Sequence, residues 1–294
     1  MIIILTLQFL SAVGFILFKE TLSYGSPFFL VSIRMLLGCM PLLAYQLVKY
    51  PQSFKILRRG LIMPIFVAAF FNVYAANGYG LWAMQYTSAS ITSLIYNFSP
   101  FISALLGYFL LREQMTYKKM AALIVGFIAL IPILFTDHIM TVDISFSRAT
   151  ATKLALLFSA ASAAYGWISV KKLMVQYNMP NVMANGLTIF LGGLIALMHA
   201  SLFEGMPQGD FSALLLTSAF AALISPAICY VLCGYVLMHF SATLLLFSGF
   251  LATIFTILLD VFLIGEAVSL LTIGCSAVAL FSVYLFYLEE KGQK

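Results

Sequence analysis

The residues of this chain that could bind a polar solute are few, and they lie inside long apolar stretches. Buried amides and phenols require hydrogen-bond partners or a wet cavity. The side chains that could line such a cavity combine hydrogen-bonding groups with aromatic faces, and they are Tyr74, Asn77, Tyr96, Asn97, Tyr165 and Tyr230. We expect these six residues to form a substrate cavity rather than a centre for covalent chemistry.

Two ionisable residues lie clearly within apolar stretches. Arg34 is about two turns into the second stretch, and Asp260 is about one turn from the end of the ninth. Charged groups inside a membrane are costly and usually functional. We therefore assign both residues to coupling or gating. Asp260 is a candidate proton or cation site, or alternatively a residue at a hydrated helix end, and an ion pair with Arg34 is geometrically feasible.

Neighbouring residues extend the coupling assignment. Thr253, Thr256 and Asp260 follow spacings of three and four, so they share one helical face, which could instead serve close helix packing. Pro100 interrupts the fourth stretch and is expected to free the carbonyl of Tyr96 toward the cavity. A second small-polar stripe is expected to serve helix packing, and it consists of Asn181, Asn185, Thr188 and Gly192.

The elements that must position these residues are membrane-spanning helices. The chain is 63% hydrophobic and 9% charged, with a mean hydropathy of +1.06, whereas soluble domains are about 25% charged. Continuous apolar segments, rather than alternating ones, predict helices and exclude a β-barrel. The fold class is therefore an all-α polytopic membrane protein with ten transmembrane helices, at about 2–18, 27–47, 61–82, 87–111, 117–136, 152–173, 180–203, 211–237, 241–264 and 269–288.

The distribution of basic residues predicts the orientation. Eleven of the 15 lysines and arginines fall in loops on the side of the two termini, three fall on the other side, and Arg34 lies inside a span. Cytoplasmic loops are rich in lysine and arginine, so both termini are expected in the cytoplasm. No stretch interleaves basic and aromatic residues on a soluble face, so nucleic acid is not an expected partner.

The chain repeats itself at a spacing of 153 residues. This shift pairs Ser88 with Ser241 and Glu113 with Glu266, and it places each of the first five spans over one of the last five. We predict two five-helix repeats, residues 1–141 and 150–294. Because five is odd, the second repeat enters the membrane inverted, which is typical of secondary transporters. Glu113 and Glu266 are expected to lock helix starts or loops at opposite membrane borders.

Three short motifs carry a family resemblance: Ser26-Pro27 followed by Arg34, the TSAS and SAT starts at 87–90 and 241–243, and the LLREQMT and LIGEAVS exits at 110–116 and 263–269. With these, the chain resembles the ten-span EamA-like branch of the drug/metabolite transporter superfamily. The second half departs from the pattern, with Leu187 in the place of Arg34 and Thr253 in that of Pro100. The resemblance implies a carrier of amino acids or other small metabolites in a bacterial inner membrane.

The leading functional hypothesis is a secondary active transporter of an amino acid or amino-acid derivative, working by alternating access with a proton or an exchanged metabolite. The alternative within the superfamily is an S-adenosylmethionine uptake or exchange carrier, and the alternative from another class is a non-transporting membrane partner protein. Enzymatic function is not expected, since the sequence contains no HExxH or GxSxG motif, and the lack of a nucleotide-binding loop argues against a primary pump. No cofactor is expected, and Cys229 and Cys233 lack the histidines that a metal site would need.

Overall fold

The computed structural model describes residues 1–22, 24–57, 59–86, 96–136, 146–205, 211–264 and 270–292. Every regular element in these ranges is helical, which confirms the all-α prediction for the described chain. The α-helices are α1 (Ile2–Thr21), α2 (Pro27–Lys49), α3 (Arg59–Ala69), α4 (Ala76–Met84), α6 (Ser99–Leu111), α7 (Tyr117–Thr136), α8 (Phe146–Val175), α9 (Asn181–His199), α10 (Phe211–Ala222), α11 (Tyr230–His239), α12 (Ala242–Phe247), α13 (Gly249–Ile264) and α14 (Leu270–Gly292). The 3₁₀ helix η1 (Pro51–Ile56) follows α2, and three π-helical turns are η2 (Phe70–Ala75), η3 (Ala200–Glu204) and η4 (Leu223–Cys229).

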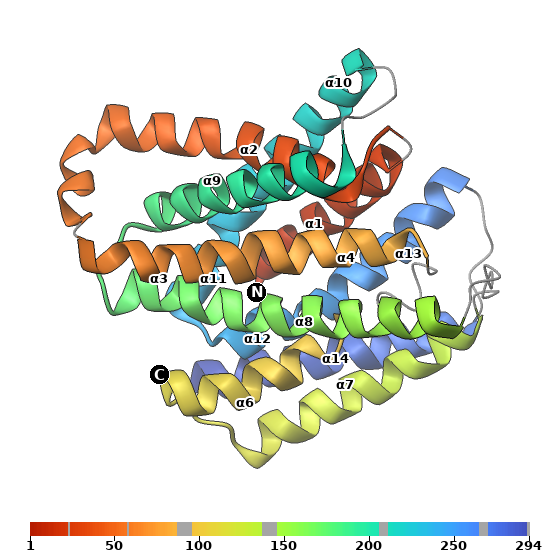
Figure 1. Cartoon of the computed structure of the whole chain (residues 1–294). Helices are drawn as coiled ribbons and strands as arrows, with labels where there is room; N and C mark the ends of the chain where they lie inside the picture. Colours follow the sequence, from red (N-terminus) through yellow and green to blue (C-terminus); the bar gives the residue numbers. More distant parts are fainter. Residues whose placement is uncertain are drawn as a thin grey trace.

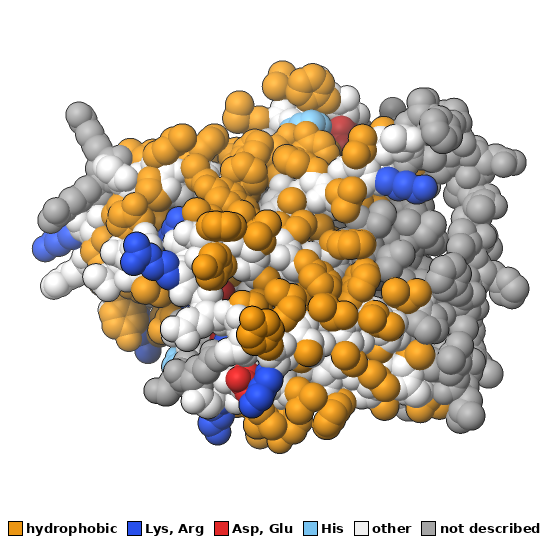
Figure 2. All heavy atoms as spheres, turned by 90° about the horizontal axis from the view of Figure 1, so that it is seen from below, with side chains coloured by type: hydrophobic (Ala, Val, Ile, Leu, Met, Phe, Trp, Pro, Cys, Tyr) orange, Lys and Arg blue, Asp and Glu red, His pale blue; other side chains and the backbone are white. Residues whose placement is uncertain are grey.

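The surface of the bundle suits a lipid environment. Among the described residues, six helices are long and apolar enough to cross a membrane, and three further apolar helices are shorter. Figure 2 shows hydrophobic side chains across the middle of one face, with most of the visible lysines and arginines toward its left end. Large side chains such as Met63 and Phe109 are 65% and 70% exposed. Apolar surface of this extent is stable when lipid, rather than water, covers it.

Segments far apart in the sequence lie side by side in the bundle. Helix α2 packs along α9, α7 along α14, and α4 along α8 (Figure 1). The small-polar stripe of α9 serves this packing, as the sequence predicted: Asn185 and Thr188 are fully buried. At Gly192, an added Cβ would lie 2.4 Å from the Cβ of Val73, so only glycine permits this approach of α9 to η2.

Two spans contain a π-helical turn near their middle. The helix α3–η2–α4 runs from Arg59 to Met84, and α10–η4–α11 runs from Phe211 to His239. The turn η4 contains Pro226, whose ring cannot donate a backbone hydrogen bond. The first residues of the two turns, Phe70 and Leu223, are 153 positions apart. Single π turns are frequent at functional sites, so these two turns mark the middle of the bundle for closer examination.

The fourth predicted span differs from a single helix over 87–111. Residues 87–95 lie outside the described residues, and Asn97 and Phe98 form a turn before α6 begins at Ser99. Pro100 lies in the first turn of α6, where its missing N–H would have no helical partner in any case. Pro100 therefore lies at the N-terminal end of α6, and its gating role stays a prediction.

Candidate functional site

A hydrogen-bonded cluster joins three helices at the level of the π turns. The Arg34 guanidinium on α2 donates through Nη2 to Asn77 Oδ1 on α4 at 3.1 Å. Asn77 Nδ2 donates to Tyr230 Oη, at the start of α11, at 3.2 Å. The same amide nitrogen lies 3.0 Å from the carbonyl oxygen of Val73 and 3.1 Å from that of Asn72. The structure thus brings together one residue predicted for gating and two predicted for the cavity.

The local fold explains why this cluster forms. Arg34 and Tyr230 are buried, and a buried charge or phenol is stable only with hydrogen-bond partners. Asn77 lies two residues after the end of η2, so its amide reaches back to the carbonyls of the π turn. It therefore satisfies backbone acceptors on its own helix while its oxygen accepts from Arg34. This arrangement orients two polar side chains from different parts of the chain toward each other.

Aromatic side chains lie against the cluster and against η2. Tyr96 is half-buried and directly precedes the turn before α6. The ring of Trp167 on α8 is 5.0 Å from that of Tyr230, and the ring of Tyr165 contacts Phe71 at 4.8 Å, edge to face. Asn97 is buried in the turn before α6, and no hydrogen bond between described residues joins it to the cluster.

Two buried polar side chains beside the cluster lack partners among the described residues. They are the amide of Asn72, in η2, and the hydroxyl of Ser162, on α8. Ser162 and Gly166 are four residues apart and lie on one face of α8. A Cβ added at Gly166 would lie 2.4 Å from the Asn72 Cα, so this face packs closely against η2. Leaving such a group unsatisfied costs about 1–3 kcal/mol. A polar ligand or water is the usual explanation, so this seam suits a solute-binding site.

Tyr74 lies apart from the cluster. Its Oη shares a hydrogen bond of 2.8 Å with Nδ1 of His199, at the end of α9. The imidazole ring of His199 stacks on Phe28 with ring centroids 3.9 Å apart. Tyr74 therefore belongs to an aromatic group at the first turn of α2, a contact that sequence reasoning missed because it joins residues 125 positions apart.

The predicted coupling residues of α13 are placed only in part. Thr253 and Thr256 are half-buried, and the Thr256 hydroxyl donates to the carbonyl of Ala252 on its own helix at 2.9 Å. Helix α13 packs against α1, where the rings of Phe9 and Phe255 meet edge to face. The side chain of Asp260 lies outside the described residues, so the coupling roles of α13 stay predictions.

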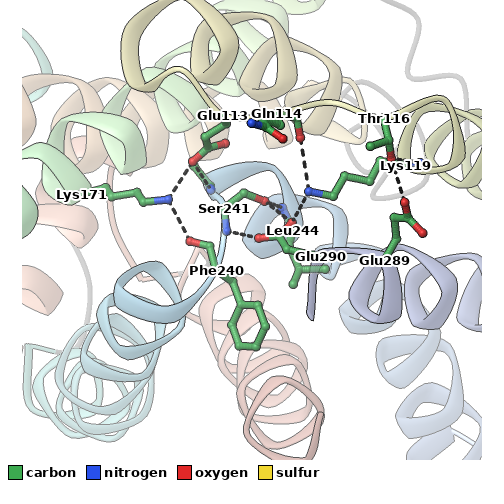
Figure 3. Close-up of polar contacts among 11 residues, drawn as sticks. Glu113, Gln114, Thr116, Lys119, Lys171, Phe240, Ser241, Leu244, Glu289 and Glu290 are labelled. Carbon is green, nitrogen blue, oxygen red and sulfur yellow. Dashed lines mark hydrogen bonds and ion pairs between the residues drawn. The ribbon is translucent and has the colours of Figure 1, made fainter. Parts of the chain in front are cut away.

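A second polar centre lies at one end of the bundle (Figure 3). Glu113, just after α6, forms an ion pair with Lys171 of α8, with 2.7 Å between Oε1 and Nζ. The same Oε1 accepts a hydrogen bond from the backbone N–H of Ala242 at 3.2 Å. Lys171 Nζ also donates to the carbonyl of Phe240 at 2.9 Å. The prediction that Glu113 locks a helix start is confirmed, and Glu266 lies outside the described residues.

A second carboxylate holds the same helix start. Glu290 of α14 accepts from both the backbone N–H and the hydroxyl of Ser241, the N-cap of α12. It also pairs with Lys119 of α7 at 3.4 Å, and these two side chains are only 7% and 5% exposed. We call Glu113, Lys119, Lys171, Ser241 and Glu290 the ion-pair network. Because its members come from distant segments, the sequence alone does not single out Lys119, Lys171 or Glu290.

Comparison with known proteins identifies the family. The model of the EamA-like transporter family matches residues 1–135 and again residues 151–288. The chain belongs to the EamA-like transporter family. The resemblance stated from the motifs is thereby confirmed, and the family places the chain among the membrane transporters of the drug/metabolite superfamily.

Individual relatives of this EamA-like chain cover nearly all of it. An S-adenosylmethionine/S-adenosylhomocysteine transporter of Chlamydia muridarum is 28% identical over 282 residues, which are 92% of this chain and 88% of that protein. A transporter of the same description from Chlamydia trachomatis is 29% identical over 283 residues, 92% of this chain and 86% of that protein. A solved crystal structure superposes on this chain with a TM-score of 0.79, and the match covers 99% of this chain and 97% of the other chain. The two sequences are 16% identical, so this match shows a shared fold.

Proposed function

We propose that this transporter is a secondary carrier that moves S-adenosylmethionine, S-adenosylhomocysteine or a closely similar amino-acid derivative by alternating access. The substrate class is supported by the two chlamydial relatives, which match over more than nine-tenths of the chain. The mechanism is supported above all by one contact, the hydrogen bond between Asn77 and Tyr230.

That contact joins positions 153 residues apart, the spacing of the sequence repeat. The same spacing relates the starts of η2 and η4, the ends of α6 and α13, and the starts of α7 and α14. In a structure with two-fold symmetry, a residue can touch its equivalent in the other half only near the symmetry axis. We therefore propose two inverted five-helix halves, 1–141 and 150–294, with Asn77 and Tyr230 on their axis. In inverted-repeat transporters, substrate binds at this interface near the middle of the membrane.

The cluster on the proposed axis suits one end of an amino-acid derivative. A guanidinium such as that of Arg34 can bind a carboxylate through two parallel hydrogen bonds. Leu187 occupies the equivalent position in the second half, so the site would hold one carboxylate and not two. The rings of Tyr96, Tyr165 and Trp167 offer faces for an adenine or a sulfonium. Substrate would also meet the unpartnered amide of Asn72.

The ion-pair network supports a state that is closed at one end. Glu113 follows α6 of the first half, whereas Lys171 and Ala242 belong to the second half, so their bonds tie the two halves together. Both termini lie at this end, since the Met1 amino group donates to Tyr287 Oη at 3.2 Å. Together with the basic loops, this supports cytoplasmic termini in a bacterial inner membrane and a structure closed toward the cytoplasm.

Transport by the purified protein in proteoliposomes tests the proposal. Vesicles loaded with unlabelled S-adenosylhomocysteine should take up labelled S-adenosylmethionine, and empty vesicles should be assayed with and without a proton gradient. Competition by amino acids but not by the two adenosyl compounds would favour the broader amino-acid reading. If no solute moves under any gradient, the carrier proposal fails and a partner-protein role gains support.

The variant Tyr230→Phe tests the proposed axis. We expect uptake to fall about fivefold, because the lost hydroxyl bridges the two halves beside the substrate and one hydrogen bond contributes about 1 kcal/mol. The matched control is Tyr235→Phe on the same helix, since that side chain is 42% exposed. Equal uptake by the two variants, at equal thermal stability, would remove Tyr230 from the site.

A further inference from the structure

A cavity opens at the end of the bundle opposite the ion-pair network. Its volume is about 420 Å³, and we call it the aromatic pocket. Its walls include Phe28, Tyr79, Trp82, His199, Phe203 and Glu204. Ala155 of α8 also lines it, whereas Lys171 of the same helix belongs to the network. At 1.5 Å per residue, these two positions are about 24 Å apart along α8. The pocket and the network therefore lie near opposite membrane borders.

The walls of the pocket are mostly aromatic rings that pack against one another. Phe28 is only 2% exposed, stacks on His199 at 3.9 Å and meets Tyr79 edge to face at 5.5 Å. Phe203 is 76% exposed, so its ring is available to a solute. Aromatic faces attract both flat heteroaromatic rings and organic cations. A ligand that carries both groups would use this surface well.

One carboxylate gives the pocket its charge. Glu204 Oε2 accepts from the backbone N–H of Phe28 at 3.0 Å and from that of Phe29 at 3.3 Å, so it caps the start of α2. A helix N-terminus carries roughly half a positive charge, which offsets only part of the carboxylate charge. In the described part of the chain, no lysine or arginine forms an ion pair with Glu204. Among the described residues, only the N-terminus of α2 balances this carboxylate, which lines the pocket.

The pocket adjoins the proposed substrate site. Phe28 and Arg34 are six residues apart on α2, or about 9 Å along the helix axis. Arg34 would repel a cation, while Glu204 would attract one. The two sites therefore prefer opposite charges on a solute that passes between them.

We propose that the aromatic pocket is a separate, outer binding site for a cationic metabolite with a flat ring, and that Glu204 makes this site prefer the cation. The inference rests on the proposed function for its ligands. S-adenosylmethionine carries a positively charged sulfonium, whereas S-adenosylhomocysteine has a neutral thioether and is otherwise the same but for one methyl group. Glu204 then discriminates between the two ligands, while Phe203 contacts the adenosyl group that they share.

The experiment measures binding of both ligands to the full chain in lipid nanodiscs. Glu204→Gln removes the charge and keeps an oxygen that can accept from α2. We expect it to weaken S-adenosylmethionine binding about tenfold and S-adenosylhomocysteine binding less than about twofold. Phe203→Leu should weaken both ligands by a similar factor, about threefold. The matched controls are Glu289→Gln, a partly exposed carboxylate at the other end, and Leu202→Ala, and both should leave binding unchanged.

Three outcomes would overturn the proposal or its premise. If Glu204→Gln weakened the binding of both ligands equally and lowered the melting temperature, Glu204 would act only as the cap of α2. Unchanged binding in Glu204→Gln and Phe203→Leu would remove the pocket from the pathway. Wild-type protein that binds neither ligand would refute the proposed substrate, and the sulfonium preference with it. Only the first two results would leave the proposed function intact.

Discussion

The two ends of this bundle use the same local device for different purposes. At each end, a carboxylate accepts hydrogen bonds from the first backbone N–H groups of a helix: Glu113 at α12, and Glu204 at α2. At the α12 end, Lys171 neutralises the carboxylate. At the α2 end, no described lysine or arginine does so, and aromatic rings surround the carboxylate instead.

The difference between the ends follows from what the remaining charge can attract. A carboxylate whose charge is balanced by both a helix N-terminus and a lysine attracts a further cation only weakly, and its bonds hold segments together. A carboxylate that is paired with a helix alone retains part of its charge for a ligand. Alternating access requires one closed end and one accessible end. The comparison therefore predicts distinct consequences for the loss or gain of a lysine at each end.

The largest effect is expected from the most buried pair. Lys119→Ala would leave Glu290 without its cation in a site where both side chains are less than 10% exposed. Removing one partner of a buried ion pair costs about 3–5 kcal/mol, so the free energy of unfolding in detergent should fall by this amount. Lys118→Ala is the control, because Lys118 is 82% exposed and exposed pairs contribute about 0–1 kcal/mol. Similar losses in the two variants would contradict the assigned burial.

A lysine added at the α2 end should give Glu204 a cationic partner like the one that Glu113 has in the ion-pair network. Phe203→Lys places an ammonium beside Glu204, and because Phe203 is 76% exposed, the change loses little packing beyond the ring contact with His199. We expect S-adenosylmethionine affinity to fall about tenfold beyond the effect of Phe203→Leu, since the new cation occupies the carboxylate and repels the sulfonium. Ligand titration of both variants measures this. An affinity equal to that of Phe203→Leu would show that charge is irrelevant in the pocket.

The smallest effect concerns the equilibrium between closed and open states. Lys171→Met removes a partly exposed cation shared by Glu113 and Phe240, so the network end should open about fivefold more often. The probe is Ala242→Cys, a position that is fully buried, in a chain whose native cysteines are replaced by alanine. Its reaction with an impermeant maleimide should accelerate by that factor. Lys172→Met is the control, and an unchanged rate in Lys171→Met would show that this pair does not restrain the end.

Much of this architecture could be predicted from the chain alone. Apolar runs of about 20 residues are obliged to become helices in a membrane, because the backbone must satisfy its own hydrogen bonds there. That rule predicted the all-helical character of the described residues, and the spacing of small polar residues predicted the packing role of the stripe on α9. The motifs also indicated the family, and the place of Glu113 after α6 indicated a border residue.

What only the tertiary structure decided was the partner of each polar side chain. The sequence did not indicate that Arg34 donates to Asn77, a residue 43 positions away on a helix that a π turn shifts in register. The sequence predicted Tyr74 and Asn77 for the same cavity, yet the Tyr74 hydroxyl is hydrogen-bonded to His199 at the end of α9. No sequence pattern near Glu204 indicated that it caps α2, because Glu204 and Phe28 are 176 positions apart. Helix formation depends on neighbouring residues, whereas hydrogen bonds and charge pairs between helices depend on how the whole bundle packs.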